Sequence, residues 1–172
     1  MHGHFVLTSG RHSPVYWEKF RVIEEPVATV KLCHMIADHY RNQGVDVVAG
    51  PTTGGIILAH EIARQLGVRS AFAEKVGNSR AFRRGVAITP EDNVLIVDDI
   101  LTTGLSLKDV IDAVKTVGAK VAGIAVLVDR SDNGVEFGFP LFSCLRSPAV
   151  SYAPDVCPLC KEHRPLTKLG GI

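Results

Sequence analysis

Two adjacent acids, Asp98 and Asp99, interrupt an apolar run, and small hydroxyl-bearing residues and glycine follow them. The segment reads NVLIVDDILTTGLS over residues 93–106, and a helical pattern resumes after it. Amides and hydroxyls at the start of a helix can wrap a phosphate, which the helix dipole also attracts. Carboxylates instead suit a polyol, a divalent cation or developing positive charge. The pattern predicts a sugar-phosphate site with the ribose over the acids and the phosphate held by Thr102, Thr103, Gly104, Leu105 and Ser106.

Two further strand ends carry residues suited to an anion. The apolar run VDVVAG precedes the turn PTTGG, whose glycines allow close approach and whose amides open a helix. The run SAFAEK ends at Lys75, and the polar, basic residues 76–85 after it are expected to form a mobile loop. Because the carboxyl ends of parallel strands meet at one edge of a sheet, we expect these groups together. The expected anion-binding residues are Thr52, Thr53, Gly54, Gly55, Lys75, Arg80, Arg83 and Arg84.

The elements that must position these residues alternate between strand and helix. Two extended runs at residues 4–10 and 14–20 predict a hairpin, and Pro26 predicts a helix to about residue 42. We then expect strands at 45–50, 70–75, 93–99 and 121–130, and helices at 56–67 and 105–118. This order predicts an α/β fold with a central, mostly parallel sheet flanked by helices. Residues 131–140 are expected to be a turn-rich connection.

Length and composition favour one domain over residues 1–172, with residues 148–172 as a C-terminal appendage. The chain is 46% hydrophobic, and its 19 basic and 18 acidic residues give a net charge of +1. Such a balance supplies no field to recruit nucleic acid or an anionic membrane, so neither is expected as a partner. The sequence has neither a signal-peptide pattern nor an apolar stretch of ~18 residues, and we expect a soluble cytoplasmic protein.

The four cysteines are too few and too unevenly spread for a disulfide framework, so we expect reduced thiols. Cys157 and Cys160 have the spacing of half a zinc site, with His163 nearby as a further candidate ligand. Without a second cysteine pair, a reduced turn is favoured over a zinc site, and no protein-bound metal is expected there. The histidines near the N-terminus, His2, His4 and His12, are interpreted as surface residues or base-pocket lining.

The stretch VLIVDDILTTGLS resembles the phosphoribosyl pyrophosphate fingerprint of type I phosphoribosyltransferases. It differs from a nucleotide P-loop because no Gly-Lys-Ser/Thr follows the glycine. The segments GHFVLTSGRHSPVYWEKF, GPTTGGI, FAEK, LVDR and CPLC are similar, in order, to the orotate-using members of that family. The resemblance implies the type I phosphoribosyltransferase fold with an N-terminal hairpin or hood at residues 1–25. It also implies phosphoribosyl transfer from phosphoribosyl pyrophosphate to orotate, giving orotidine 5-monophosphate and pyrophosphate in pyrimidine nucleotide biosynthesis.

The resemblance also assigns roles by position. Asp98 and Asp99 would face the ribose hydroxyls, residues 102–106 would hold the 5-phosphate, and residues 52–55 would meet the pyrophosphate. Lys75 would help the pyrophosphate leave. Arg130 would pair with the orotate carboxylate, and Tyr16 and Trp17 would line the base pocket. The implied cofactor is Mg²⁺, held mainly through the substrate with the two acids as additional ligands, and the implied assembly is a homodimer that exchanges the basic loop.

Several alternatives remain open from the sequence. The acceptor base can be uracil or a purine, or the chain can be a regulator that senses phosphoribosyl pyrophosphate without catalysis. The two acids can be helix caps, and the basic segment can be a solvated loop. Arg130 can be structural, tied to Asp129 or Asp132.

Overall fold

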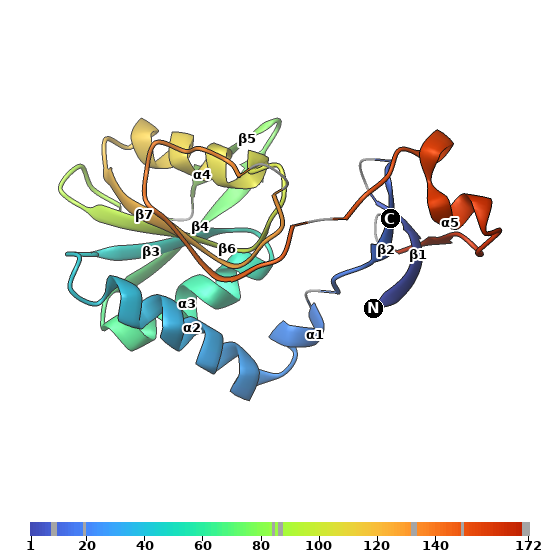
Figure 1. Ribbon diagram of the computed structural model, residues 1–172. Coiled ribbons are helices and arrows are strands. Elements are labelled where there is room, and N and C mark those ends of the chain that lie inside the picture. Colours follow the sequence, from blue (N-terminus) through green and yellow to red (C-terminus); the bar gives the residue numbers. More distant parts are fainter. Residues whose placement is uncertain are drawn as a thin grey trace. The chain divides into compact units, whose positions relative to one another are not determined.

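The computed structural model describes residues 1–7, 10–18, 20–83, 85, 88–131, 134–148 and 150–169. The chain forms two compact units (Figure 1). The large unit spans Lys19–Ser147, and the small unit joins Met1–Glu18 to Pro148–Ile172. The start of the expected C-terminal appendage coincides with the boundary of the small unit. The grouping of both units into one functional domain stays a prediction.

A six-stranded sheet forms the centre of the large unit, with the strand order β5-β4-β3-β6-β7-β8. Strand β5 is antiparallel to β4, and the other neighbouring pairs are parallel. The expected mostly parallel sheet is therefore confirmed. The strands are β3 (Val47–Pro51), β4 (Arg69–Val76), β5 (Ser79–Phe82), β6 (Asn93–Leu101), β7 (Lys120–Asp129) and β8 (Leu141–Arg146).

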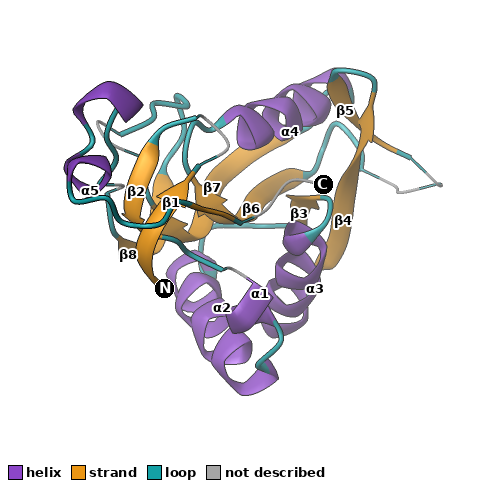
Figure 2. Cartoon of the chain, turned by 90° about the vertical axis from the view of Figure 1, so that its right-hand side faces the viewer, coloured by secondary structure: helices purple, strands orange, loops and turns teal. Residues whose placement is uncertain are grey.

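Helices cover both faces of this sheet (Figures 1 and 2). Helices α2 (Pro26–Tyr40) and α3 (Gly54–Leu66) pack on one face, and α4 (Leu105–Thr116) packs on the other. A short helix, α1 (Phe20–Ile23), precedes α2. In β6, Val94 and Ile96 join the core under α4, whereas Leu95 and Val97 join the core under α2 and α3. The apolar run of β6 thus fills both layers, because successive strand residues point to opposite faces.

The contact of α2 with β7 is unusually close. Tyr40, which is 1% exposed, donates a hydrogen bond from its hydroxyl to the carbonyl of Ile124 over 3.0 Å. A Cβ atom at Gly123 would lie 2.7 Å from that hydroxyl oxygen. Burial raises the pKa of Tyr40 to about 12, so the phenol stays protonated at neutral pH. The ring of Tyr40 fits here because Gly123 has no side chain.

Two parts of the large unit differ from expectation. The predicted mobile loop at residues 76–85 contains β5, which forms a hairpin with β4 through a two-residue turn. Gly77 has φ +59° at the first central position of that turn, as the type II′ turns of hairpins require. The strand β8 was not predicted; it follows the expected turn-rich connection and extends the sheet beside β7.

The small unit is built around a hairpin of β1 (His2–Val6) and β2 (His12–Val15), which confirms the predicted hairpin. Both strands start two residues before the expected runs at 4–10 and 14–20 and are shorter than expected, and Phe20 begins α1 instead. Residues from the C-terminal segment lie on both edges: β9 (Thr167–Lys168) runs parallel to β1, and Tyr152 exchanges backbone hydrogen bonds with His12. This segment also contains the short helices η1 (Pro154–Val156) and α5 (Pro158–Lys161).

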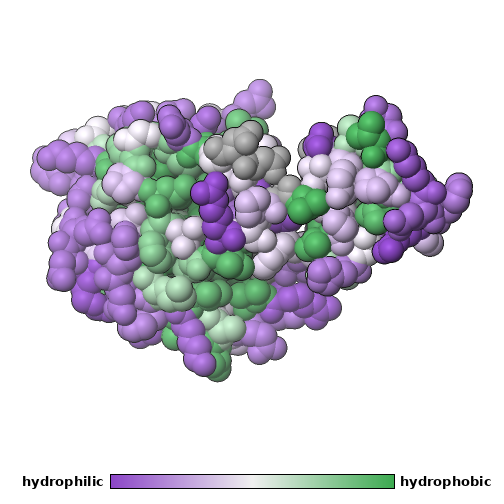
Figure 3. Space-filling view, in the orientation of Figure 1, coloured by the Kyte–Doolittle hydropathy of each residue, from purple (hydrophilic) through white to green (hydrophobic). Residues whose placement is uncertain are grey.

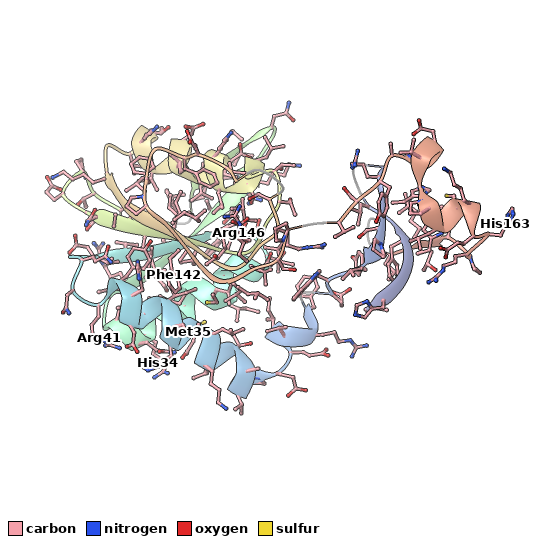
Figure 4. All side chains as sticks on the ribbon, viewed as in Figure 1. His34, Met35, Arg41, Phe142, Arg146 and His163 are labelled. Carbon is pink, nitrogen blue, oxygen red and sulfur yellow. The ribbon has the colours of Figure 1, made fainter. Side chains whose placement is uncertain are left out.

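The large unit exposes several large apolar side chains. Figure 3 shows apolar side chains gathered on one face of the large unit. The exposed apolar residues of this unit include Met35 of α2, labelled in Figure 4, and Leu145 of β8. Within the described residues, no helix has both the length and the apolar character needed to cross a membrane.

Candidate active site

The turn after β3 packs against the acids of β6. A Cβ atom at Gly50 would overlap the backbone of Gly55, and one at Gly55 would lie 2.6 Å from Cδ of Pro51. A Cβ atom at Gly54 would overlap the carboxylate of Asp99. The glycines are therefore needed because the start of α3, the end of β3 and the acidic pair share a small volume. Two motifs that lie more than forty residues apart in sequence meet, as predicted.

The acidic pair lies inside β6, which continues to Leu101 instead of ending at the acids. Asp98 is 8% exposed and Asp99 is 3% exposed. The amide of Asp99 donates to Oδ1 of Asp98 over 2.8 Å, and the amide of Ile100 donates to Oδ1 of Asp99 over 2.7 Å. These bonds fix the orientation of both carboxylates. Gly104 occupies the N-cap position of α4, so neither acid is the N-cap residue of this helix.

The loop after β6 encloses a small cavity at the start of α4. Its volume is about 70 Å³, more than the ~30 Å³ share of one liquid water. Gly104 has φ +77°, and a Cβ atom there would lie 2.9 Å from side-chain atoms of Val135 and Phe137. The first turn of α4 carries no acid, so the helix dipole favours an anion at this end. The cavity is lined by Asp98, Ile100, Leu101 and the predicted phosphate-binding residues Thr102, Thr103, Gly104, Leu105 and Ser106, with Leu107.

Basic side chains lie beside the turn after β3. Arg80 donates from Nη1 to Oγ1 of Thr52 and to the carbonyl of Ala73, each over 3.1 Å. Lys75 is exposed and lines an open cavity of about 410 Å³ together with Thr52, Phe72 and Glu74. The hairpin of β4 and β5 therefore presents a lysine and an arginine to the edge of the sheet where the glycine turn lies. Its register places Lys75 opposite Arg80.

The remaining basic candidates of the segment differ in position. Arg83 follows β5 and is exposed, and Arg84 lies outside the described residues. Their predicted contact with substrate stays a prediction.

Arg130 follows β7 directly and is 8% exposed. Its amide donates to the carbonyl of Leu101 over 2.8 Å, which fixes it beside the end of β6. Neighbouring Asp129 accepts hydrogen bonds at Oδ1 from the amide and the hydroxyl of Ser131, over 2.9 and 2.6 Å. Asp132 lies outside the described residues, so the choice between a structural and a substrate-binding Arg130 stays open.

Tyr16 and Trp17 belong to the small unit. The ring of Tyr16 packs against Phe5 with centroids 5.7 Å apart, and Tyr16 and Trp17 both keep partly exposed surfaces. Their predicted role in the base pocket remains untested.

A larger groove of about 570 Å³ lies elsewhere in the large unit. It is lined by residues of α2 and α3 and their ends, among them His34 and Arg41, which Figure 4 labels. None of its lining residues belongs to the strand-end motifs. The convergence of glycine turn, buried acids and helix start therefore identifies the candidate active site better than cavity size does.

Comparisons with known proteins show the family to which the chain belongs. Residues 24–145 match the phosphoribosyl transferase domain family. The chain is 45% identical to orotate phosphoribosyltransferase of Chlorobaculum parvum, covering 98% of this chain and 87% of that protein. It is 44% identical to that of Desulforamulus reducens, covering 98% and 88%. The crystal structure of the Mycobacterium tuberculosis H37Rv orotate phosphoribosyltransferase superposes with a TM-score of 0.71 at 28% identity, covering 85% of this chain and 88% of that one. The chain therefore belongs to the phosphoribosyltransferase family and, within it, to the orotate phosphoribosyltransferases.

Proposed function

We propose that the protein transfers the 5-phosphoribosyl group from phosphoribosyl pyrophosphate to orotate, giving orotidine 5-monophosphate and pyrophosphate. The observation that carries this proposal is the 44–45% identity to orotate phosphoribosyltransferases over 98% of the chain. The meeting of the acidic pair, the loop after β6 and the turn after β3 supports it. Under this proposal residues 1–172 act as one domain, with residues 1–25 contributing to the base pocket.

The proposed roles follow from where charge changes during the reaction. Breaking the bond between C1 and the pyrophosphate leaves a cationic, oxocarbenium-like sugar and a departing anion of high charge. The carboxylates of Asp98 and Asp99 beneath the ribose stabilise the cationic sugar. Lys75 and Arg80 stabilise the departing pyrophosphate. The loop after β6 holds the 5-phosphate at the start of α4, which fixes the ribose over the acids. Arg130 pairs with the orotate carboxylate and thereby selects an acidic base.

The acids also fit the magnesium requirement of the proposed reaction. Carboxylate oxygens are ligands that Mg²⁺ prefers, and the two buried carboxylates lie beside the glycine turn proposed to meet the pyrophosphate. Bound to the diphosphate, Mg²⁺ would neutralise charge that the loop after β6, which contains no lysine, leaves uncompensated. The turn at Thr52–Gly55 would then orient the leaving group through its amides.

A cytoplasmic homodimer is the proposed working form. Lys75 is exposed on the β4–β5 hairpin, one strand pair before its turn, where it can reach a neighbouring subunit. The exposed apolar side chains of Met35 and Leu145 offer surface that a second subunit would bury.

A turnover assay with phosphoribosyl pyrophosphate and five bases tests the proposal. Orotate should be consumed, whereas uracil, adenine, hypoxanthine and xanthine should not, and pyrophosphate should appear in equal amount. Chelation should abolish turnover, and Mg²⁺ added alone should restore it. Preference for another base would disprove the orotate assignment. Binding of phosphoribosyl pyrophosphate without turnover of any base would indicate a sensor instead of an enzyme.

A further inference from the structure

The small unit brings together four side chains that the strand-end motifs do not use. They are His4 of β1, His12 of β2, Cys157 directly before α5, and Cys160 within α5. Their nitrogen and sulfur atoms all lie within 4.8 Å of one another. His4 and His12 are only 4% and 6% exposed, so the expectation that they are surface residues is wrong.

The hairpin explains how the two histidines meet. Val6 pairs with His12 across the strands, His4 lies two residues before Val6, and the two imidazole rings meet edge to face with centroids 5.0 Å apart. The two imidazoles are therefore diagonal neighbours, close enough for long side chains to touch. The spacing Cys-x-x-Cys places the thiols of Cys157 and Cys160 on one turn, which the C-terminal segment holds against the two imidazoles.

Four of the six distances between these atoms lie near the edges of a tetrahedron around one zinc ion, and all six are within 4.8 Å. Zinc bonds of ~2.0–2.1 Å to nitrogen and ~2.3 Å to sulfur give edges of about 3.3 Å between nitrogens and about 3.6 Å between nitrogen and sulfur. His4 Nε2 and His12 Nδ1 are 3.2 Å apart. The sulfurs of Cys157 and Cys160 lie 3.6 and 3.7 Å from His4 Nε2, and that of Cys160 lies 3.2 Å from His12 Nδ1.

Hydrogen bonding alone does not account for this convergence. His4 Nδ1 lies 2.9 Å from the carbonyl oxygen of Arg164, which can only accept, so Nδ1 donates there and the neutral ring presents the lone pair of Nε2 on its other side. That single lone pair faces three polar atoms at once, from His12, Cys157 and Cys160. One central cation would use all four groups together. A carbonyl bonded to the far nitrogen is also the usual support of a zinc-bound histidine.

We propose that His4 Nε2, His12 Nδ1 and the sulfurs of Cys157 and Cys160 bind one zinc ion as a closed, structural site. Two thiolates and two imidazoles select zinc over Mg²⁺, which takes oxygen ligands. Four protein ligands leave no position for substrate, so the ion stabilises the fold and takes no part in phosphoribosyl transfer.

The small unit is of a size at which a bound metal ion would contribute to its stability. The unit has roughly forty residues, a length at which a hydrophobic core alone is marginal and a metal or disulfide is usually needed. Among its described residues, the buried apolar side chains are Phe5, Leu159 and Cys157. The proposed ion would join the hairpin to the C-terminal segment, whose remaining links are backbone pairing and bonds such as that from Arg11 to Ser151.

Metal content and thiol release test the proposal on the full-length protein, purified under reducing conditions. We expect one zinc per chain. A strong chelator should release it together with two thiols that react with a disulfide reagent at pH 8. Cys33 and Cys144 should stay silent, because burial raises the pKa of their thiols to about 12 and about 11. Neither measurement depends on orotate, so failure here and failure of the proposed function are distinguishable.

Matched variants identify the ligands. Cys160→Ser and His12→Asn should lose stoichiometric zinc. His163→Asn changes an exposed histidine in the same segment, labelled in Figure 4, and Cys144→Ser changes a thiol of the large unit; both should keep it. Zinc that persists in both ligand variants, or is lost in both controls, would overturn the assignment.

Cobalt substitution covers the case in which the ligand variants fail to fold. Co²⁺ bound to the wild-type chain should give the intense visible bands of a tetrahedral ion and the thiolate charge-transfer band of two sulfur ligands. A chain that holds no zinc and takes up neither Zn²⁺ nor Co²⁺ would overturn the proposal. Octahedral Co²⁺ without sulfur bands would do the same.

Discussion

At the residue scale, the acidic pair shows how much chemistry can be predicted from residue types. A carboxylate in a strand that fills two core layers is costly unless it is held, and backbone amides hold Asp98 and Asp99. The amino-acid types therefore predict a functional site at this position, and the TTGLS segment predicts an anion site where the structure has a small cavity. The extension of β6 beyond the acids was not predicted, because polar residues usually end buried strands.

The acidic pair leads to the first prediction. Replacing Asp98→Asn together with Asp99→Asn keeps size and shape but removes the charge that opposes the cationic sugar. We expect kcat to fall by ~10²-fold or more, which corresponds to about 2.7 kcal/mol of transition-state stabilisation. Steady-state kinetics measure the loss, and circular dichroism checks the fold. Asp112→Asn, on the exposed side of α4, is the control and should be silent. A fully active double variant would contradict the role.

Arg130 gives a second prediction at this scale. The proposed contact with the orotate carboxylate is a charge-assisted pair in a buried position, and truncating such a partner typically costs ~2 to 5 kcal/mol. Arg130→Ala should therefore raise KM for orotate far more than KM for phosphoribosyl pyrophosphate. Arg41→Ala, at the end of α2, is an exposed arginine control. Equal losses for both substrates would indicate that Arg130 is structural.

The zinc ligands could not be assigned from sequence for a physical reason. His4 and His12 meet Cys157 and Cys160 only through pairing between the two ends of the chain, including β1 with β9. A half-site such as Cys-x-x-Cys specifies spacing along one segment and says nothing about what lies opposite. The sequence contained one partial signal: His4 lies in the first run of the predicted hairpin, and His12 lies in its predicted turn.

At the element scale, the hydrophobic periodicity predicted the central strands and helices. It did not predict the edge strand of the sheet or which side of a helix is buried. Strand β8 is a short, partly exposed run at the edge of the sheet, and its pattern is weak. Helix α2 carries apolar residues on more than one side. Val27 and Val30 continue the helical spacing of Ala37 and Tyr40, yet they are 70% and 40% exposed. Packing against β7 decides which side of this helix is buried, and local sequence does not contain that information.

The close contact of α2 with β7 makes a prediction about stability. Gly123→Ala would place Cβ 2.7 Å from the hydroxyl of Tyr40, so the ring must shift and its bond to Ile124 must weaken. Overpacking of this kind costs roughly 1–3 kcal/mol, which urea denaturation measures. Tyr40→Phe alone should cost about 0.5–1.5 kcal/mol through the lost hydrogen bond.

The double variant supplies the control. Removing the hydroxyl relieves the shortest contact, so Gly123→Ala with Tyr40→Phe should cost less than the two single changes added together. Strictly additive costs would show that the two residues do not compete for space.

At the scale of the whole molecule, the position of Lys75 leads to a prediction about assembly. Lys75 is exposed on the β4–β5 hairpin, while the acids are buried in β6. If Lys75 acts in the neighbouring subunit, two inactive proteins should complement each other. Mixing Lys75→Ala with the variant Asp98→Asn, Asp99→Asn produces heterodimers in which one site carries both lesions and the other is intact.

About half of the native activity per heterodimer should return, measured after subunit exchange. Each inactive variant incubated alone is the control. Differently tagged subunits report the exchange independently of activity. Demonstrated exchange without recovered activity would rule out a role for Lys75 across the interface.

The small unit also determines the order in which the protein can form during synthesis. Its hairpin is made first, but the segment that pairs with both of its edges is made last, after the whole large unit. At roughly 5–20 residues per second, the delay on the ribosome is on the order of ten seconds. Through that interval β1 and β2 present unpaired edges and a pair of histidines without their cysteines. The N-terminal hairpin therefore waits for its edge partners until the large unit has been synthesised.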